Sequence, residues 1–137
     1  MRLQEIRTYT TVPPAGIGGS FWVFVEVETD DGVTGVGECY GVPFSADVTA
    51  SMIADTFERY IVGADPHHLE RLFRRVYSAG FTQRPDLSMM GVFSGIEMAI
   101  WDILGKAHGV PVYELLLSLI HISEPTRPER IGYCGVW

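Results

Sequence analysis

The first 40 residues place apolar or β-branched side chains in short runs with polar residues between them, a pattern typical of strands. Residues 3–11 are rich in Ile, Tyr and Thr, and residues 21–28 combine aromatic and β-branched side chains with acids. A third run, 33–40, follows Asp31 and Gly32, and an Asp-Gly pair supplies the positive φ of a tight hairpin turn. The pattern predicts an antiparallel meander of three strands.

The segment 12–20 between the first two of these runs breaks the pattern. It holds two prolines, which lack a backbone donor, and three glycines, which raise the entropy cost of any fixed conformation. We therefore expect a mobile loop.

After Pro43 the apolar period changes from about two to about 3.6 residues, which predicts helices. Ser45 is the expected N-cap of the first helix. The second helix is expected to begin after Asp65, as N-cap, with Pro66 at the first helical position, where its missing donor costs nothing. The expected apolar face of the first helix is Val48, Met52, Ile53, Phe57, Tyr60 and Ile61, and that of the second is Leu69, Leu72, Phe73, Val76 and Tyr77.

A third helix is expected over residues 90–108, ended by Gly109 and Pro111, with a short helix at 111–116 after it. Strands first and helices afterwards is the order of an α+β domain, in which the helical bundle packs on one face of the sheet. The expected apolar face of the third helix is Ile96, Ala99, Ile100, Ile103 and Leu104, and Phe93 and Trp101 are also interpreted as core residues.

Composition restricts the partners. A chain of 137 residues with 47% hydrophobic and 20% charged positions suits one globular core. The net charge of −7, the single lysine Lys106 and the scatter of the nine arginines along the chain argue against nucleic acid and acidic membranes as partners.

Cys39 and Cys134 lie far apart, so the sequence suggests neither a disulfide framework nor a zinc site. The N-terminus has no apolar signal region, and no run of 18 apolar residues occurs. We expect a soluble, cytoplasmic protein.

Two motifs have both a functional and a structural interpretation. The pair His67 and His68, with Asp65 and Glu70, resembles a metal cluster, but adjacent histidines point to different faces of a helix, which favours a solvated helix end. Gly32, Gly35 and Gly37 lack the spacing of a dinucleotide fingerprint and open a strand, so we expect them to serve the hairpin.

A third such motif is the acid pair Glu97 and Asp102. These carboxylates lie five positions apart on one helix and so face different directions, which favours structural hydrogen bonding over paired acid-base chemistry.

Three segments together resemble a known family: the meander with its Asp31–Glu38 motif, the helix at 95–106 and the segment 111–116. They are similar to the mandelate racemase and muconate-lactonizing branch of the enolase superfamily over about residues 1–116. The resemblance implies an enzyme that abstracts the proton α to a carboxylate and holds the enediolate on Mg²⁺, as racemases, cycloisomerases and acid-sugar dehydratases do.

The resemblance also implies that the catalytic groups of such an enzyme lie on a β/α barrel, and this sequence has none of them. A Lys-x-Lys base is impossible with Lys106 alone. We therefore expect no catalytic residue, metal ligand or cofactor in this chain, and Mg²⁺ only in a full-length enzyme.

In relatives, two segments of this domain cover the barrel mouth, and they match the segments 14–20 and 39–45. The resemblance implies that these residues cap the substrate, with Arg84 as a partner for its carboxylate or hydroxyl groups. A surface loop and a solvated Arg84 are the alternative. The expected substrate-capping residues are Gly16, Ile17, Gly18, Gly19, Tyr40, Phe44 and Arg84.

Residues 117–128 depart from the family, whose members usually have a Gly-Gly pair there. This stretch resembles the translation of a sequencing adapter, and we treat it as a hypothetical artefact, with residues 129–137 as the start of a truncated barrel.

The expectation is thus a capping domain, inactive alone, of an acid-sugar dehydratase or a racemase-like enzyme, acting on a small carboxylate substrate through the missing barrel. The full-length relative is expected to be a homo-oligomer, and the chain alone to be poorly soluble. A stand-alone, non-catalytic binding or oligomerisation module of the same fold is the alternative.

Overall fold

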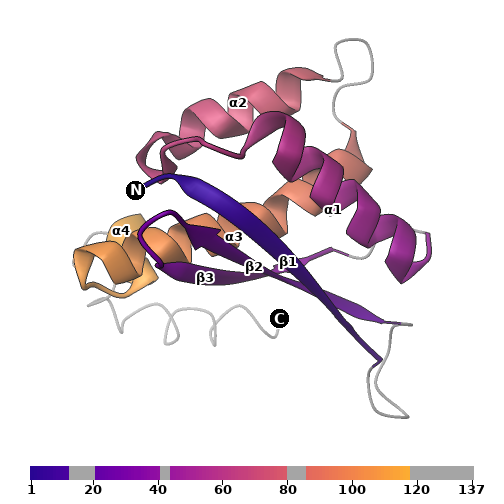
Figure 1. Ribbon diagram of the computed structural model, residues 1–137, viewed down its shortest axis with the longest axis horizontal. Helices are drawn as coiled ribbons and strands as arrows, with labels where there is room; N and C mark the ends of the chain where they lie inside the picture. The colour runs from indigo at the N-terminus through magenta and orange to yellow at the C-terminus, as the bar shows by residue number, and fades with distance from the viewer. Residues whose placement is uncertain (13–20, 41–43, 80–85, 118–137) are drawn as a thin grey trace, which may run out of the picture.

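The computed structural model describes residues 1–12, 21–40, 44–79 and 86–117, and in these residues the strands precede the helices, as expected for the α+β class (Figure 1). The strands form one antiparallel sheet in the order β1-β2-β3. The strands are β1 (Leu3–Thr11), β2 (Trp22–Thr29) and β3 (Thr34–Cys39), and the helical elements are α1 (Ala46–Tyr60), η1 (Pro66–His68), α2 (Leu69–Ala79), α3 (Leu87–His108) and α4 (Val112–Leu116).

The sheet has one buried and one open face, because alternate side chains of each strand point to opposite sides. Val23, Val25 and Val27 of β2 point inward and are almost completely buried. Helix α3 packs against β2 and β3, while α1 packs against β1 and β2, so both helices cover the same face (Figure 1).

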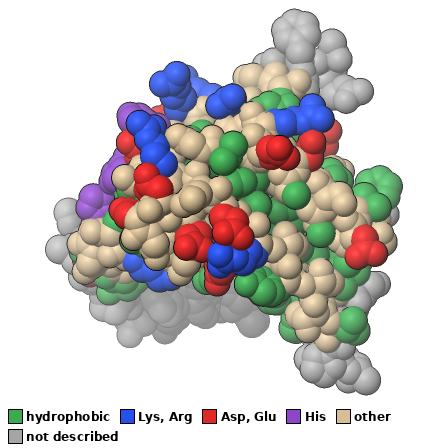
Figure 2. Space-filling model, viewed as in Figure 1, with side chains coloured by type: hydrophobic (Ala, Val, Ile, Leu, Met, Phe, Trp, Pro, Cys, Tyr) green, Lys and Arg blue, Asp and Glu red, His purple; other side chains and the backbone are tan. Residues whose placement is uncertain are grey.

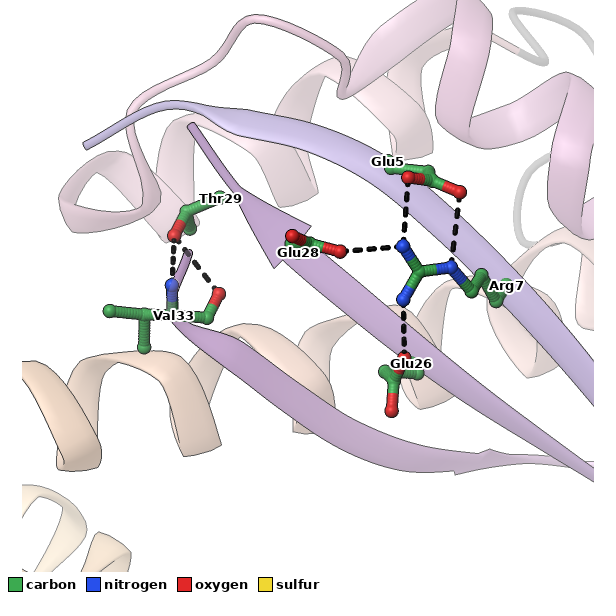
Figure 3. A network of polar contacts seen from close by, with 6 residues as sticks. All are labelled: Glu5, Arg7, Glu26, Glu28, Thr29 and Val33. Atoms are coloured by element: carbon green, nitrogen blue, oxygen red, sulfur yellow. Dashed lines mark hydrogen bonds and ion pairs between the residues drawn. The ribbon is translucent and has the colours of Figure 1, made fainter. Parts of the chain in front are cut away.

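On the open face, one arginine joins the two neighbouring strands β1 and β2. Arg7 donates to Glu5 at 3.0 and 3.1 Å, to Glu26 at 2.8 Å and to Glu28 at 2.6 Å (Figure 3). Hydrogen bonds to these carboxylates, Glu5 first, raise the pKa of Arg7 above its ordinary value. The cluster is solvated, so its contribution to stability is small.

The hairpin between β2 and β3 confirms the Asp-Gly prediction. Gly32 has a φ of 82°. The Thr29 hydroxyl accepts from the Val33 amide at 3.0 Å and donates to the Val33 carbonyl at 2.9 Å, which closes the turn (Figure 3).

The expected N-caps and the C-terminal glycine of the helices are confirmed, and one further N-cap, Asp86, was not predicted from the sequence. Ser45 Oγ accepts from the Val48 amide at 3.4 Å, and Gly109 ends α3 in the left-handed conformation with φ 67°. Asp65 caps as expected, although the chain first makes the 3₁₀ turn η1 before α2 begins. Helix α3 begins at Leu87 rather than residue 90, because Asp86 accepts from two amides of its first turn at 2.9 and 3.1 Å.

Helix α3 and strand β3 approach so closely that their backbones meet, and glycines make this possible. A Cβ at Gly35 would collide with the Ala99 carbonyl oxygen, and one at Gly37 with the Gly95 carbonyl oxygen. A Cβ at Gly95 would in turn collide with Cys39. The interpretation that all three glycines of 32–37 serve the hairpin is therefore wrong for Gly35 and Gly37. We call this contact the β3–α3 seam.

The expected core faces are confirmed at most positions, with exceptions on the helix flanks. Every residue of the expected apolar face of α3 is buried, as is Phe93, but Phe73 of α2 is 38% exposed and Val48 of α1 is 44% exposed. Phe73 stacks on Tyr77 at 5.8 Å and lies 5.9 Å from Phe93 at the edge of the core, and its side chain lines a surface groove. Trp101 is likewise only half-buried.

Helix α3 has the length and apolar composition that a membrane span would need. The central helix of a folded domain shares both properties, and the buried face of α3 packs on the sheet here. This observation therefore gives no independent support for a membrane location.

Candidate functional site

Two of the chain connections with expected capping residues leave the sheet at the same end. Thr11, the last residue of β1, pairs with Trp22, and Val23 pairs with Cys39, the last residue of β3. The ends of β1 and β3 and the beginnings of α1 and α3 accordingly lie together on the right of Figure 1. We call this side of the domain the loop end.

Large apolar side chains are exposed at the loop end. Tyr40 is 73% exposed and lies over α3 at Gly91, where an added Cβ would contact Tyr40 Cβ and Cδ1 at 3.4 Å. Leu87, one turn before Gly91, is 80% exposed, and Phe44, just before α1, is 54% exposed. Figure 2 shows many hydrophobic side chains on the right half of the molecule, while most charged ones lie on the left, at the top and in the lower centre. We refer to the exposed side chains of Tyr40, Phe44 and Leu87 together as the loop-end patch.

The structure thus places two of the expected capping residues, Tyr40 and Phe44, on the surface at the loop end. Gly16, Ile17, Gly18, Gly19 and Arg84 lie outside the described residues. That these residues contact substrate stays a prediction. The same holds for the expected domain limits at residues 116 and 128.

The residue before Tyr40 anchors the loop end to the core. Cys39 is 3% exposed, and its thiol donates to the Val92 carbonyl oxygen at 3.3 Å. Burial raises the pKa of the Cys39 thiol to about 12, so the thiolate is scarce at neutral pH and the group is a poor nucleophile. These observations favour a structural role for Cys39.

The carboxylate of Asp65 is occupied by the start of η1. Asp65 Oδ1 accepts from the His67 amide at 3.0 Å and lies 2.9 Å from His67 Nδ1, and these bonds, the amide first, lower the pKa of Asp65. Glu70 instead pairs with Arg74 at 2.6 Å. Among the residues that the structure describes, no group of three or more His, Cys, Asp or Glu side chains is arranged to hold a metal ion.

Asp102 and Lys106 hold the outer edge of β3, so the structural interpretation of Asp102 is confirmed. Asp102 Oδ2 accepts from the Val36 amide at 3.0 Å and from Lys106 Nζ at 2.8 Å, and Lys106 Nζ also donates to the Thr34 carbonyl at 2.9 Å. Glu97 lies elsewhere, in a groove between helices. The two carboxylates therefore do not act together.

Two surface grooves were not anticipated from the sequence. The first has a volume of about 650 Å³ and is mostly apolar; it is lined by Leu69, Phe73, Trp101, Leu104 and Leu115, with His67, Glu70, Glu97 and His108. The rings of His67 and His108 meet edge to face at 5.4 Å in this groove. Phe73 and Trp101, expected in the core, form part of its wall.

The second groove, of about 640 Å³, is lined by basic side chains, and we call it the arginine groove. It brings Arg2 beside Arg71, Arg74 and Arg75 of α2, so the expectation of scattered arginines is wrong for these four. Blue side chains accordingly gather at the upper left of Figure 2. The helical spacing of the three α2 arginines was a readable signal, whereas nothing local connects Arg2 to them.

The chain is similar over most of its length to one group of proteins. The sequence model of the mandelate racemase / muconate lactonizing enzyme N-terminal domain matches residues 10–116. A D-galactonate dehydratase of Xanthomonas campestris pv. campestris (strain B100) is 39% identical over 122 residues, which are 88% of this chain and 29% of that protein.

Solved structures agree with this similarity. A mandelate racemase/muconate lactonizing enzyme-like protein from Roseovarius sp. TM1035 matches with a TM-score of 0.81 and 50% identity, over 85% of this chain and 30% of that one. A mandelate racemase/muconate lactonizing enzyme from Sulfitobacter sp. matches with a TM-score of 0.81 and 47% identity over the same shares. The chain thus spans about 30% of the length of these relatives.

Proposed function

The chain belongs to the mandelate racemase / muconate lactonizing enzyme family, whose N-terminal domain it contains, and from this we propose that it caps the substrate site of an acid-sugar dehydratase. The reaction proposed for the whole enzyme begins with removal of the proton α to the substrate carboxylate. The substrate class is suggested by the D-galactonate dehydratases among the relatives.

The observation that carries the proposal is that two of the chain connections expected to cap the substrate meet at the loop end. Two connections leave the sheet there, beside exposed Tyr40 and Phe44. A soluble domain seldom leaves large apolar side chains together on its surface without a partner, so these residues suit a surface that closes over a pocket.

A cap of this kind acts by excluding water. Removing water lowers the local dielectric constant, which strengthens the interaction of the enediolate with the positive charges that stabilise it. Tyr40 and Phe44 would supply apolar cover and shape the pocket for one substrate. The β3–α3 seam would hold them in place, because buried Cys39 immediately precedes Tyr40.

The catalytic base and the Mg²⁺ ligands of the proposed enzyme are assigned to protein outside this chain. The described residues do not fit a Mg²⁺ site, since they contain no suitable group of carboxylates. We therefore propose that the chain alone is inactive, and derive no step of the reaction through a metal here.

A chimera tests the proposal. Residues 1–116 of this chain replace the matching domain of the Xanthomonas campestris D-galactonate dehydratase, and dehydration of D-galactonate and other aldonates is measured with Mg²⁺. The chimera should be active and the chain alone inactive. Tyr40→Ala and Phe44→Ala should raise KM about tenfold, which corresponds to about 1.4 kcal/mol of lost substrate contact.

Tyr113→Ala is the matched control, because Tyr113 is an exposed tyrosine on α4 with 51% of its surface accessible. It should leave KM and kcat unchanged. Unchanged KM in an active chimera carrying Tyr40→Ala and Phe44→Ala would contradict the capping role. Turnover by the chain alone would contradict the assignment of catalysis to the rest of the protein.

A further inference from the structure

The arginine groove concentrates positive charge on a chain whose net charge is −7. Arg2 lies just before β1, and Arg71, Arg74 and Arg75 lie on one side of α2, 69 or more residues further along the chain. His68 lines the same groove. The fold, and not local sequence, creates this concentration.

Little in the described structure neutralises these arginines. Arg74 has a close carboxylate partner, Glu70, at 2.6 Å. Arg75 donates only to the Arg59 carbonyl at 3.4 Å and the Arg2 guanidinium only to the Gly63 carbonyl at 3.5 Å, and neither acceptor carries a charge.

The Arg71 side chain makes no hydrogen bond or ion pair with any described residue. Asp65, the carboxylate at the rim, already accepts from the His67 amide and lies 2.9 Å from the His67 ring. The groove therefore keeps an excess of guanidinium groups over carboxylates.

We propose that the arginine groove is a binding site for a small polyanion with two or more phosphate or carboxylate groups. A guanidinium presents paired N–H donors that match these groups in a bidentate way, and four arginines line this groove. The volume of about 640 Å³ lies within the usual range for small-molecule sites. Leu72 and Ala64 add an apolar surface, which strengthens the charge interactions.

A small ligand fits better than a long polyanion. Nucleic acid would cover much more of a surface that is acidic overall, and the resulting repulsion opposes such binding. Four arginines are instead gathered in one groove beside η1 and α2.

The arginine groove is separate from the loop end. Arg2 precedes the first residue of β1, whereas the loop end lies beyond its last residue, and β1 has nine residues. At about 3.3 Å per residue, the two sites lie about 30 Å apart along the strand. A polyanion in the groove is therefore a second ligand and not the substrate that the loop end would cover.

Binding of inorganic pyrophosphate and of citrate to the 137-residue chain tests the proposal, by calorimetry at constant ionic strength set with NaCl. We expect saturable binding of at least one probe at one site, with a Kd below about 1 mM. The ratio of the two affinities identifies a phosphate or a carboxylate ligand.

Arg71→Gln should weaken binding about tenfold, since it removes one bidentate contact, and Arg71→Gln combined with Arg75→Gln should weaken it further. Arg59→Gln is the matched control. It removes the same charge from an exposed side chain of α1 that is paired with Asp55 at 2.7 Å, and it should change Kd less than about twofold.

Three outcomes would overturn the proposal. The first is no saturable binding of either probe, and the second is equal weakening of binding by Arg59→Gln and Arg71→Gln. The third is that the groove variants lose self-association and not probe binding. The last result would make the groove a protein–protein surface.

Arg71 is exposed, so its variants should fold. Arg71→Lys gives a second test, because lysine keeps the charge but lacks the planar guanidinium fork. It should weaken binding about threefold, and undiminished binding would argue against bidentate recognition.

Discussion

The β3–α3 seam and the loop-end patch are neighbours along the chain at Cys39 and Tyr40, but they differ sharply in burial. In the seam, Gly37 and Gly95 bring two backbones into contact and Cys39 is almost completely buried. One residue further along the chain, Tyr40 is 73% exposed, and Leu87 at the start of α3 is 80% exposed.

This difference in burial predicts a role in folding for the seam and a role in contacts with other molecules for the patch. Every contact of the seam is made within the described residues, so the seam stabilises the fold without help. The side chains of the loop-end patch are mostly exposed in the described structure, so they contribute little to its core. We therefore expect substitutions in the seam to affect folding, and substitutions in the patch to affect association and, in the whole enzyme, substrate affinity.

The largest expected effect is the protection of the Cys39 thiol. Its pKa is about 12 in the fold against an ordinary 9.0, so below pH 9 its thiolate fraction falls about a thousandfold relative to the unfolded chain. Alkylation by iodoacetamide at pH 8, in a Cys134→Ser background, should slow by at least that factor in the folded chain. The kinetics with and without urea provide the measurement.

The same shift sets an alkaline limit to stability. Because the folded pKa is raised, the contribution of Cys39 is complete below pH 9 and is lost as the pH rises toward 12. In the alkylation experiment, a rate in the folded chain near that of the unfolded chain would mean that the seam opens readily. That result would contradict the contrast between a buried seam and an exposed loop-end patch.

The next largest effect is expected at Gly37. In Gly37→Val the new side chain would meet the Gly95 carbonyl oxygen, so α3 has to move from the sheet, at a cost of about 3 kcal/mol. Urea unfolding measures this loss. Val36→Thr, at the neighbouring exposed position, should change stability by less than about 0.5 kcal/mol, and similar losses in both variants would contradict the close approach.

A smaller effect is expected at Asp102. Asp102→Ala removes the acceptor of the Val36 amide and the partner of Lys106, but the site is partly solvated, so the loss should be about 1 kcal/mol. Asp55→Ala removes a comparable helical pair, with Arg59, that does not reach a strand. It should cost less than about 0.5 kcal/mol by the same urea measurement. Equal losses would show that the bond to β3 adds no stability.

The smallest effect on stability is expected in the loop-end patch. Tyr40→Ser with Leu87→Ser should change the free energy of unfolding by less than about 0.5 kcal/mol, because both side chains are exposed. The same variant should reduce self-association, measured by sedimentation velocity, since it removes apolar surface. Tyr113→Ser should not. A monomeric wild-type chain at high concentration would contradict the role of the patch in association.

The sequence predicted local structure well and contact between distant segments poorly. The hairpin glycine Gly32, the cap Ser45 and the buried stripe of α3 all follow from short-range rules, and each is confirmed. The close approach at Gly35 and Gly37 was missed, because nothing in a strand pattern shows which backbone will lie beneath it. Phe73 was misplaced because helical periodicity does not show how far the neighbouring elements extend.

The candidate sites, too, depend on information that the local sequence pattern does not contain. Resemblance to a family was needed to select Tyr40 and Phe44, since an exposed aromatic residue in a connection has no signature of its own. The arginine groove depends on Arg2 meeting α2, and a contact across about 70 positions is determined by the tertiary fold.

The only lysine of the chain has a consequence for the resistance of the domain to aggregation. Lys106 and Asp102 occupy the Thr34 carbonyl and the Val36 amide on the outer edge of β3, and open sheet edges are where foreign strands add and fibres begin. An edge blocked by the domain's own helix needs no neighbouring protein to protect it there.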